Sequence, residues 1–231
     1  SSKAQNATQD GSYTKKPALL VTTDPLPVAL TKEVYTKPNQ TADISKQDIM
    51  QGYYGNEATL VGRKINELNV DLGNLRQEVR ATSARLVDLQ RAGQDIAANY
   101  FANVATISTQ LQSGTTPGNP RLVQKLANAQ DSLDQLSNNI THLNELTVEV
   151  KNSQSVANYL LETARQAYGI SGAIEEDHVM LAKLEDEIEH TATLIRRLLN
   201  NVSDDVSRTA SYLSTERSNL RTMSLAITSG D

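Results

Sequence analysis

Two Glu-x-x-His pairs, Glu175 with His178 and Glu187 with His190, are the residues whose types and spacing could do chemistry. The spacing places a carboxylate and an imidazole on one face of a helix, which is how di-iron four-helix bundles hold their metal. Those bundles carry the pair on two helices and add glutamates from the other two. Here both pairs fall on one predicted helix, about 18 Å apart along its axis at the usual rise per residue. We therefore expect no metal site in this chain.

The sequence gives little support to other catalytic or cofactor chemistry. It contains no cysteine, which excludes a thiolate zinc site, a disulfide and a cysteine nucleophile. The remaining histidine, His142, belongs to no Ser-His-Asp or paired-carboxylate arrangement that spacing can support. No glycine-rich loop precedes the Gly-Lys-Ser/Thr of a phosphate-binding motif. We expect no catalytic residues, no cofactor and no enzymatic activity.

The helices that would position these side chains are predicted by a heptad repeat of apolar residues, which runs from about residue 49 to about residue 227. A 3.5-residue repeat keeps one stripe of a helix against a partner, so it favours coiled-coil packing over an isolated amphipathic helix. In the first of three blocks the heptad positions are Val61, Ile65, Leu68, Leu72, Leu75, Val79, Thr82, Leu86, Leu89, Gly93, Ile96, Tyr100, Asn103 and Ile107.

The second and third blocks continue the repeat from Leu122 to Tyr168 and from Leu181 to Ile227. In the second block the later heptad positions are Ile140, Leu143, Thr147, Val150, Gln154, Ala157, Leu161, Ala164 and Tyr168. Polar residues at heptad positions fix the register of packing at some loss of stability. We assign that role to Thr82, Asn103, Thr147, Gln154 and Thr191. Near Asp205 and Glu216 the strict repeat lapses, and we expect the apolar stripe to slip by one residue there.

Two breaks separate the blocks. In the first, Gly114 suits a helix end, and Asn119 can cap a helix whose first residue is Pro120. The second break lies at residues 169–172, where Ser171 is the expected N-cap. The predicted helices are therefore about 45–113, 120–169 and 171–229. The alternative is that the last two form a single broken helix.

These observations predict an all-α protein with two parts. Residues 45–231 are expected to form an elongated three-helix antiparallel bundle or coiled coil that runs up, down and up. Residues 1–44 are expected to form an extended leader, because its prolines block helix propagation. Apolar side chains interrupt this leader, and we predict that they form a docking segment for the protein's own bundle or for a partner. They are Leu19, Leu20, Val21, Leu26, Val28 and Leu30. The alternative is a plain linker.

Composition limits the possible partners. The formal net charge of −5 and the isoelectric point near 5.3 argue against nucleic acid as a partner, because phosphate binding requires a basic surface. Hydrophobic residues make up 38 % and aromatic residues 4 %, which suffices for the thin core of a bundle. No run of about 18 apolar residues occurs, so no segment is expected to span a membrane as a helix.

The first six residues, Ser1-Ser2-Lys3-Ala4-Gln5-Asn6, precede a polar leader and a long heptad repeat. This layout resembles a mature murein-lipoprotein-like protein written without its lipid-bearing first cysteine. The resemblance implies a lipid anchor before Ser1 in the outer membrane, with the helices in the periplasm. The leader is longer and richer in proline than in that family, and three helices replace one. Asp231 stands where the family has a terminal lysine, which leaves a covalent link to peptidoglycan without support.

Together, the repeat and the resemblance predict a structural or interaction protein of a bacterial cell envelope that acts as a periplasmic spacer or tether. Its expected partners are other envelope proteins and, through the coiled coil, further copies of itself. Membrane contact is expected only through the lipid anchor. The alternatives are a cytosolic or phage structural scaffold and an α-helical pore-forming toxin subunit. A toxin needs a concealed apolar hairpin to enter lipid, and the turn at 113–120 is polar.

Overall fold

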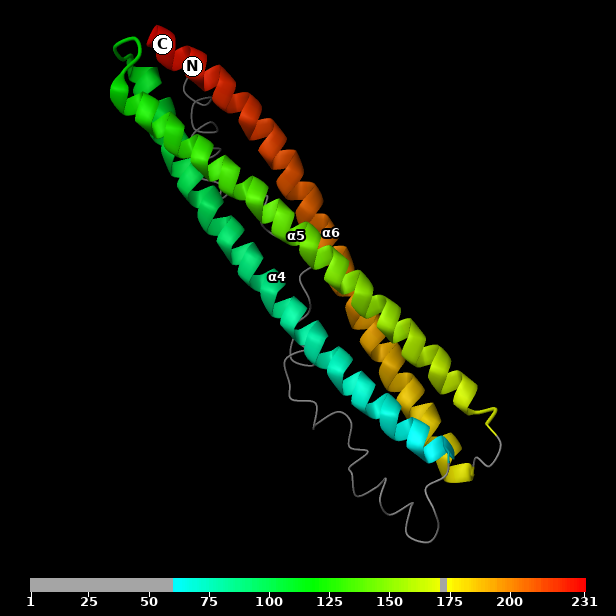
Figure 1. The fold of residues 1–231 in the computed structure, drawn as a ribbon. Coiled ribbons are helices and arrows are strands. Elements are labelled where there is room, and N and C mark those ends of the chain that lie inside the picture. The colour runs from blue at the N-terminus through cyan, green and yellow to red at the C-terminus, as the bar shows by residue number, and fades with distance from the viewer. Residues whose placement is uncertain (1–59, 171–173) are drawn as a thin grey trace, which may run out of the picture. The chain divides into compact units, whose positions relative to one another are not determined.

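The computed structural model describes residues 60–170 and 174–231, which form three α-helices and no strand (Figure 1). Helix α4 spans Leu60–Ser113, α5 spans Pro120–Ala167 and α6 spans Glu175–Ser229. The predicted all-α class is confirmed, and the contacts between the helices agree with a bundle. The predicted leader (1–44), the first part of the first predicted helix (45–59) and Ser171 lie outside the described residues.

The loop between α4 and α5 has the chemistry that the sequence predicts. Gly114 follows α4 with a φ of 77°, and its amide donates to the Leu111 carbonyl at 3.1 Å. The Asn119 side-chain oxygen accepts from the Arg121 amide at 3.0 Å and so caps α5. Pro120 takes the first helical position, where a missing amide donor is tolerated. Helix α4 therefore ends, and α5 begins, where predicted.

The same loop also holds the end of α6. The amides of Thr115 and Gly118 donate to the carbonyls of Gly230 and Ile227 at 3.1 and 2.9 Å. The last carbonyls of an α-helix have no partner within the helix, so the Gly118 bond satisfies one of them. Gly230 has a φ of 88°, and a Cβ atom there would lie 2.5 Å from the Thr115 carbonyl oxygen. Glycine is therefore required at position 230.

Helices α5 and α6 are separate elements rather than one broken helix. Helix α5 ends at Ala167 instead of residue 169, and α6 begins at Glu175 instead of residue 171. The Asp177 carboxylate accepts from the Ile174 amide at 3.3 Å, a capping bond from the third residue of the helix. The first turn is acidic, which the positive end of the helix dipole favours. The acidic first turn thus stabilises the start of α6.

The described residues divide into two compact units. Unit 1 comprises residues 86–145 and 202–231, and unit 2 comprises residues 60–85 and 146–201. Each unit contains a part of all three helices, so each has its own interior to fill.

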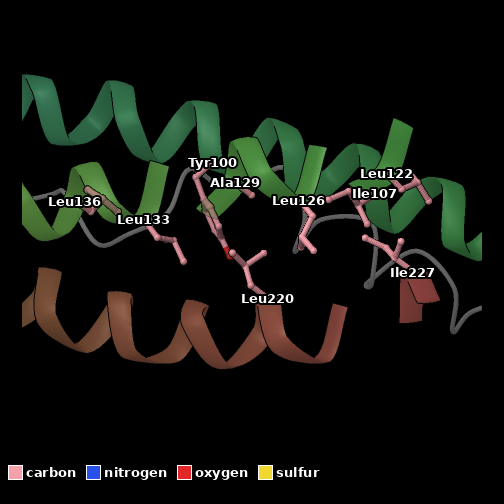
Figure 2. Close-up of a cluster of buried hydrophobic side chains, with 9 residues drawn as sticks. All are labelled: Tyr100, Ile107, Leu122, Leu126, Ala129, Leu133, Leu136, Leu220 and Ile227. Carbon is pink, nitrogen blue, oxygen red and sulfur yellow. The ribbon is translucent and has the colours of Figure 1, made fainter. Parts of the chain in front are cut away.

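The interior of unit 1 is built around Tyr100, which extends from α4 toward Leu220 of α6 (Figure 2). Aliphatic side chains from all three helices surround it. The buried members of this cluster are Tyr100, Ile107, Leu122, Leu126, Ala129, Leu133, Leu136, Leu220 and Ile227. Burial of such side chains stabilises the folded state by roughly 1.5–3 kcal/mol for each large residue.

The interior of unit 2 is aliphatic as well. Its buried side chains include Ile65, Leu68, Leu72 and Leu75 of α4, Leu146, Val150 and Leu160 of α5, and Leu181, Leu184 and Ile188 of α6. On α4 all the predicted heptad positions are buried apart from Leu89, Ile96 and Asn103, which are half-buried. The repeat therefore located the core-facing stripe of this helix.

On α5 the predicted positions up to Leu136 are buried, and so are the later positions Leu143, Val150, Ala157 and Ala164. The alternate positions from residue 139 onward differ, because there the buried residue lies one place earlier than predicted. The predicted positions Ile140, Thr147, Gln154, Leu161 and Tyr168 are half-buried. The residues directly before them are buried, namely Asn139, Leu146, Ser153, Leu160 and Ala167. A straight helix drifts by about 20° per heptad against a 3.5-residue repeat, and a helix between two neighbours buries a wider stripe than one seam. The spacing alone could not choose between adjacent residues within that stripe.

Candidate functional site

The first Glu-x-x-His pair lies at the start of α6, where Glu175 and His178 are both exposed. The His178 ring packs against Tyr168, which follows the end of α5, with centroids 5.6 Å apart and planes at 32°. Burial, followed by the carboxylates of Glu185 and Asp186, raises the pKa of the Tyr168 phenol. His178 thus makes an aromatic contact at the junction between α5 and α6.

The second pair lies farther along α6, in unit 2. Glu187 is half-buried and His190 is exposed. Burial raises the pKa of the Glu187 carboxyl, while the charges of Arg76 and Lys183 act in the opposite direction. Arg76 of α4 also donates through Nε to the Thr191 hydroxyl at 3.4 Å. The structure therefore gives Glu187 a cationic neighbour on α4.

The two pairs do not combine into a metal centre in the part of the chain that the structure describes. In residues 60–170 and 174–231, no group of three or more His, Asp or Glu side chains converges so that it could hold a metal ion. A metal ion held by protein ligands usually has at least three of them. The expectation that the chain binds no metal stays a prediction for measurement in solution.

The interior of unit 1 holds a carboxylate on α6 that the sequence reading did not place there. Asp205 is 6 % exposed, and the Gln90 side-chain amide of α4 donates to it at 2.7 Å. Burial raises the pKa of Asp205 and Asp204 adds to this effect, whereas the Gln90 hydrogen bond and Arg208 lower the pKa. The slip of the apolar stripe expected here does not occur, because Asp205 itself occupies the buried position.

A second polar contact in unit 1 joins α4 and α6 near Tyr100. The Tyr100 hydroxyl donates to the Glu216 carboxylate at 2.5 Å, and the Asn219 side-chain amide donates to the same oxygen at 3.3 Å. The Tyr212 ring meets the Tyr100 ring edge-on, with centroids 6.1 Å apart and planes at 76°. Burial and the charge of Glu216 raise the pKa of both phenols far above the usual range. Tyr100 therefore stays protonated and remains a donor at neutral pH.

The heptad spacing itself contained the signal for these two carboxylates. Asp205 lies three residues after the buried Val202, and Glu216 lies seven residues after the buried Thr209. A polar group at such a position needs a hydrogen-bond partner on a facing helix. The sequence shows which residues need partners but not that Gln90 and Tyr100 supply them.

Grooves lie between α5 and α6 in each of the two units. The groove in unit 2 measures about 390 Å³ and is lined mainly by polar side chains such as Gln154, Asn158 and Arg196. The groove in unit 1 measures about 690 Å³ and combines leucines with two arginines. Its lining includes Leu133 of α5 and Arg217, Leu220, Arg221 and Leu225 of α6. The unit 1 groove is thus suited to an apolar ligand that carries negative charge.

The predicted docking segment lies outside the described residues. Its six side chains, Leu19, Leu20, Val21, Leu26, Val28 and Leu30, all precede Leu60, the first residue that the structure describes. The docking of this segment therefore stays a prediction.

Comparison of the chain with protein-family models, with curated proteins and with solved structures found no match. None of α4, α5 and α6 contains a stretch that is long and apolar enough to cross a membrane. The described residues offer helix faces, grooves and buried polar contacts between helices.

Proposed function

We propose that this chain is a non-enzymatic structural or interaction protein that spaces or tethers components of a bacterial cell envelope, with its helices in the periplasm. The observation that carries the proposal is the use of polar side chains inside unit 1. Gln90 and Asp205, like Tyr100 and Glu216, bond across two helices instead of facing a cavity. Polar groups used in this way specify the alignment of helices, which is what a spacer of fixed length needs.

The proposed arrangement is an elongated antiparallel coiled coil of three helices. In unit 1, Gln90 bonds to Asp205 and Tyr100 bonds to Glu216, so residue numbers rise together along α4 and α6. This relation supports a parallel course of these two helices.

The course of α5 is supported by contacts in unit 2. Arg165 forms ion pairs with Glu185 at 2.9 Å and with Glu189 at 3.2 Å. Earlier on α5, Gln154 lines a groove together with Arg196, which lies later on α6. Residue numbers therefore rise along α5 as they fall along α6, which supports an antiparallel course.

The location in the envelope is proposed from the residues Ser1–Asn6 and their likeness to the start of murein-lipoprotein-like proteins. The proposed partners are other envelope proteins and further copies of the chain, with membrane contact only through a lipid before Ser1. The net charge of −5 supports partners other than nucleic acid.

The experiment is expression of the complete natural gene in its own host, with a C-terminal epitope tag, followed by cell fractionation and metabolic labelling with palmitate. We expect a palmitate-labelled protein in the outer-membrane fraction, and a cysteine directly before Ser1 in the precursor. Recovery from the cytosol without label would overturn the envelope proposal and favour a cytosolic or phage scaffold. Release of dye from liposomes by the purified chain would instead favour the toxin alternative.

The proposed arrangement has a separate test in small-angle X-ray scattering. A compact domain of this length would have a radius of gyration of about 17 Å. A rod as long as α4, which has 54 residues, would be about 81 Å long and would give a value above about 23 Å. A value near that of the compact domain would refute the elongated coiled coil and leave the envelope location to be judged by fractionation.

A further inference from the structure

The groove between α5 and α6 in unit 1 is an apolar surface with a defined floor and rim. Leu133 and Leu220 are buried at its floor, whereas Leu225 at its rim is 74 % exposed. The groove has a volume of about 690 Å³, which is within the range typical of sites that bury apolar ligands. We propose that residues 18–30 of the same chain occupy this groove. The proposal does not depend on where in the cell the protein works.

The apolar side chains of the segment match the floor and rim of the groove. Residues 18–30 contain two apolar patches, Ala18–Val21 and Leu26–Leu30, which are separated by four residues. One patch covers Leu225 while the other reaches the floor beside Leu220. Removal of these side chains from water is the driving force for docking.

The charges of the segment and the groove are complementary. Asp24, between the two patches, is the single charged residue among residues 18–30. The charged residues that line the groove are Arg217 and Arg221, and Arg217 also bonds to Asp134 at 3.3 Å. Two cations beside one anion leave an excess of positive charge. A carboxylate such as Asp24 balances this excess when it binds beside Arg221.

The segment is joined to α4 by a long connection and is favourably composed for binding. The roughly 30 residues between Leu30 and Leu60 can extend over roughly 100 Å. Pro25 and Pro27 each fix one backbone dihedral angle, which lowers the conformational entropy that the segment loses on binding.

The test is amide hydrogen exchange of residues 18–30 in the full chain. We expect slow exchange in the wild type and exchange at least about tenfold faster in Leu225→Asp. The substitution replaces one large apolar contact with a hydrated carboxylate that disfavours an apolar neighbour. Since Leu225 is largely exposed, this variant should keep the fold. The matched control is Val70→Asp on α4, where the valine is 63 % exposed and lies outside the groove, and it should leave the exchange of residues 18–30 unchanged.

A charge-swap series tests the register of the segment. Arg221→Asp should speed the exchange of residues 18–30, and adding Asp24→Arg to it should restore slow exchange. Full-speed exchange in the wild type, or protection that Leu225→Asp does not alter, would overturn the proposal. Protection that grows with protein concentration would also overturn the proposal, since a second copy would then be the occupant. Failure of the charge swap to restore slow exchange would overturn it as well.

Discussion

The hydroxyl of Tyr100 on α4 donates a 2.5 Å hydrogen bond to the carboxylate of Glu216 on α6, inside the same unit that buries the Tyr100 ring. The ring fills the apolar core while the hydroxyl satisfies a half-buried charge on the neighbouring helix. A hydrogen bond to a charged group contributes more than one between neutral groups, because the charge strengthens the attraction. This contact fixes the position of α4 relative to α6 within unit 1.

Tyr100→Phe should lower the free energy of unfolding by about 1.5–3 kcal/mol, because Glu216 then loses a donor while it stays half-buried. Urea denaturation at neutral pH measures the change. Tyr159→Phe is the control, since Tyr159 is 65 % exposed and its loss of a hydroxyl should have no measurable effect. Equal stability of Tyr100→Phe and wild type would show that the hydrogen bond is unimportant.

Asp205→Asn should make stability less dependent on pH. Burial raises the pKa of Asp205 above its unfolded value of about 3.9, so the folded state holds this proton more tightly than the unfolded state. The wild type therefore loses stability as pH rises from the unfolded pKa to the folded pKa, and this loss persists at higher pH. Asparagine cannot ionise and keeps an oxygen that accepts from Gln90.

We expect Asp205→Asn and wild type to be similarly stable below about pH 4, and the variant to be more stable at pH 7 by about 1.4 kcal/mol for each unit of pKa shift. Thermal unfolding across that pH range is the measurement. The exposed Asp131→Asn on α5 serves as the control and should follow the wild type at every pH. Destabilisation of Asp205→Asn at pH 7 would mean that the charge itself is needed, for example by Arg208.

Substitution of two adjacent leucines on α5 tests the register of its buried stripe. Leu160→Ala should lower the free energy of unfolding by about 2–5 kcal/mol, because Leu160 is 1 % exposed and its removal leaves a cavity. Leu161 is half-buried, so Leu161→Ala should lower it by about 1 kcal/mol. The reverse order in urea denaturation would support the positions predicted from the heptad repeat over those in the structure.

Alanine at two glycines should act in opposite directions. Gly230→Ala should lower the free energy of unfolding by about 1–3 kcal/mol, since φ is 88° and the Cβ atom would lie 2.5 Å from the Thr115 oxygen. Gly73→Ala, within α4, should raise it by about 0.5–1 kcal/mol, because nothing lies within 4 Å of the added atom and alanine favours the helix. Differential scanning calorimetry of both variants decides whether the two signs differ.

Zinc and chelator should both leave the melting temperature unchanged. A site that bound zinc one hundred times more tightly than the concentration added would stabilise the fold by about 2.7 kcal/mol, which is a shift of several degrees. The double variant Glu187→Ala, His190→Ala should show the same absence of a zinc-dependent shift in melting temperature as the wild type. A rise of several degrees with zinc that this double variant removes would establish the metal site that we do not expect.

The features predicted well from the sequence are those whose causes lie within a few residues. Gly114, Asn119 and Pro120 act on the backbone next to them, so the boundary between α4 and α5 could be read directly. The apolar repeat likewise located the buried stripe of α4 and most of that of α5. At alternate positions in the later part of α5 it was displaced by one residue, since the choice between Leu160 and Leu161 depends on where two other helices lie.

The polar contacts of unit 1 could not be predicted, for a different physical reason. Tyr100 and Glu216 are 116 residues apart in the chain, and their hydrogen bond depends on how far one helix has advanced along another. A heptad repeat looks the same in every heptad, so it does not determine how far one helix is displaced along the axis of another. Asp205 was noticed only as a lapse in the repeat, because spacing identifies an interruption without identifying Gln90 as its partner.

The hydrogen bonds from Thr115 and Gly118 to the end of α6 have a mechanical consequence. A pulling force applied at Asp231 does not act on the last turn of α6 alone, since the loop before α5 grips that turn at Gly230 and Ile227. The load is divided between α6 and the loop, and both of these hydrogen bonds must break before the last turn of the helix can separate from the loop. The end of α6 is therefore held in a way that resists tension.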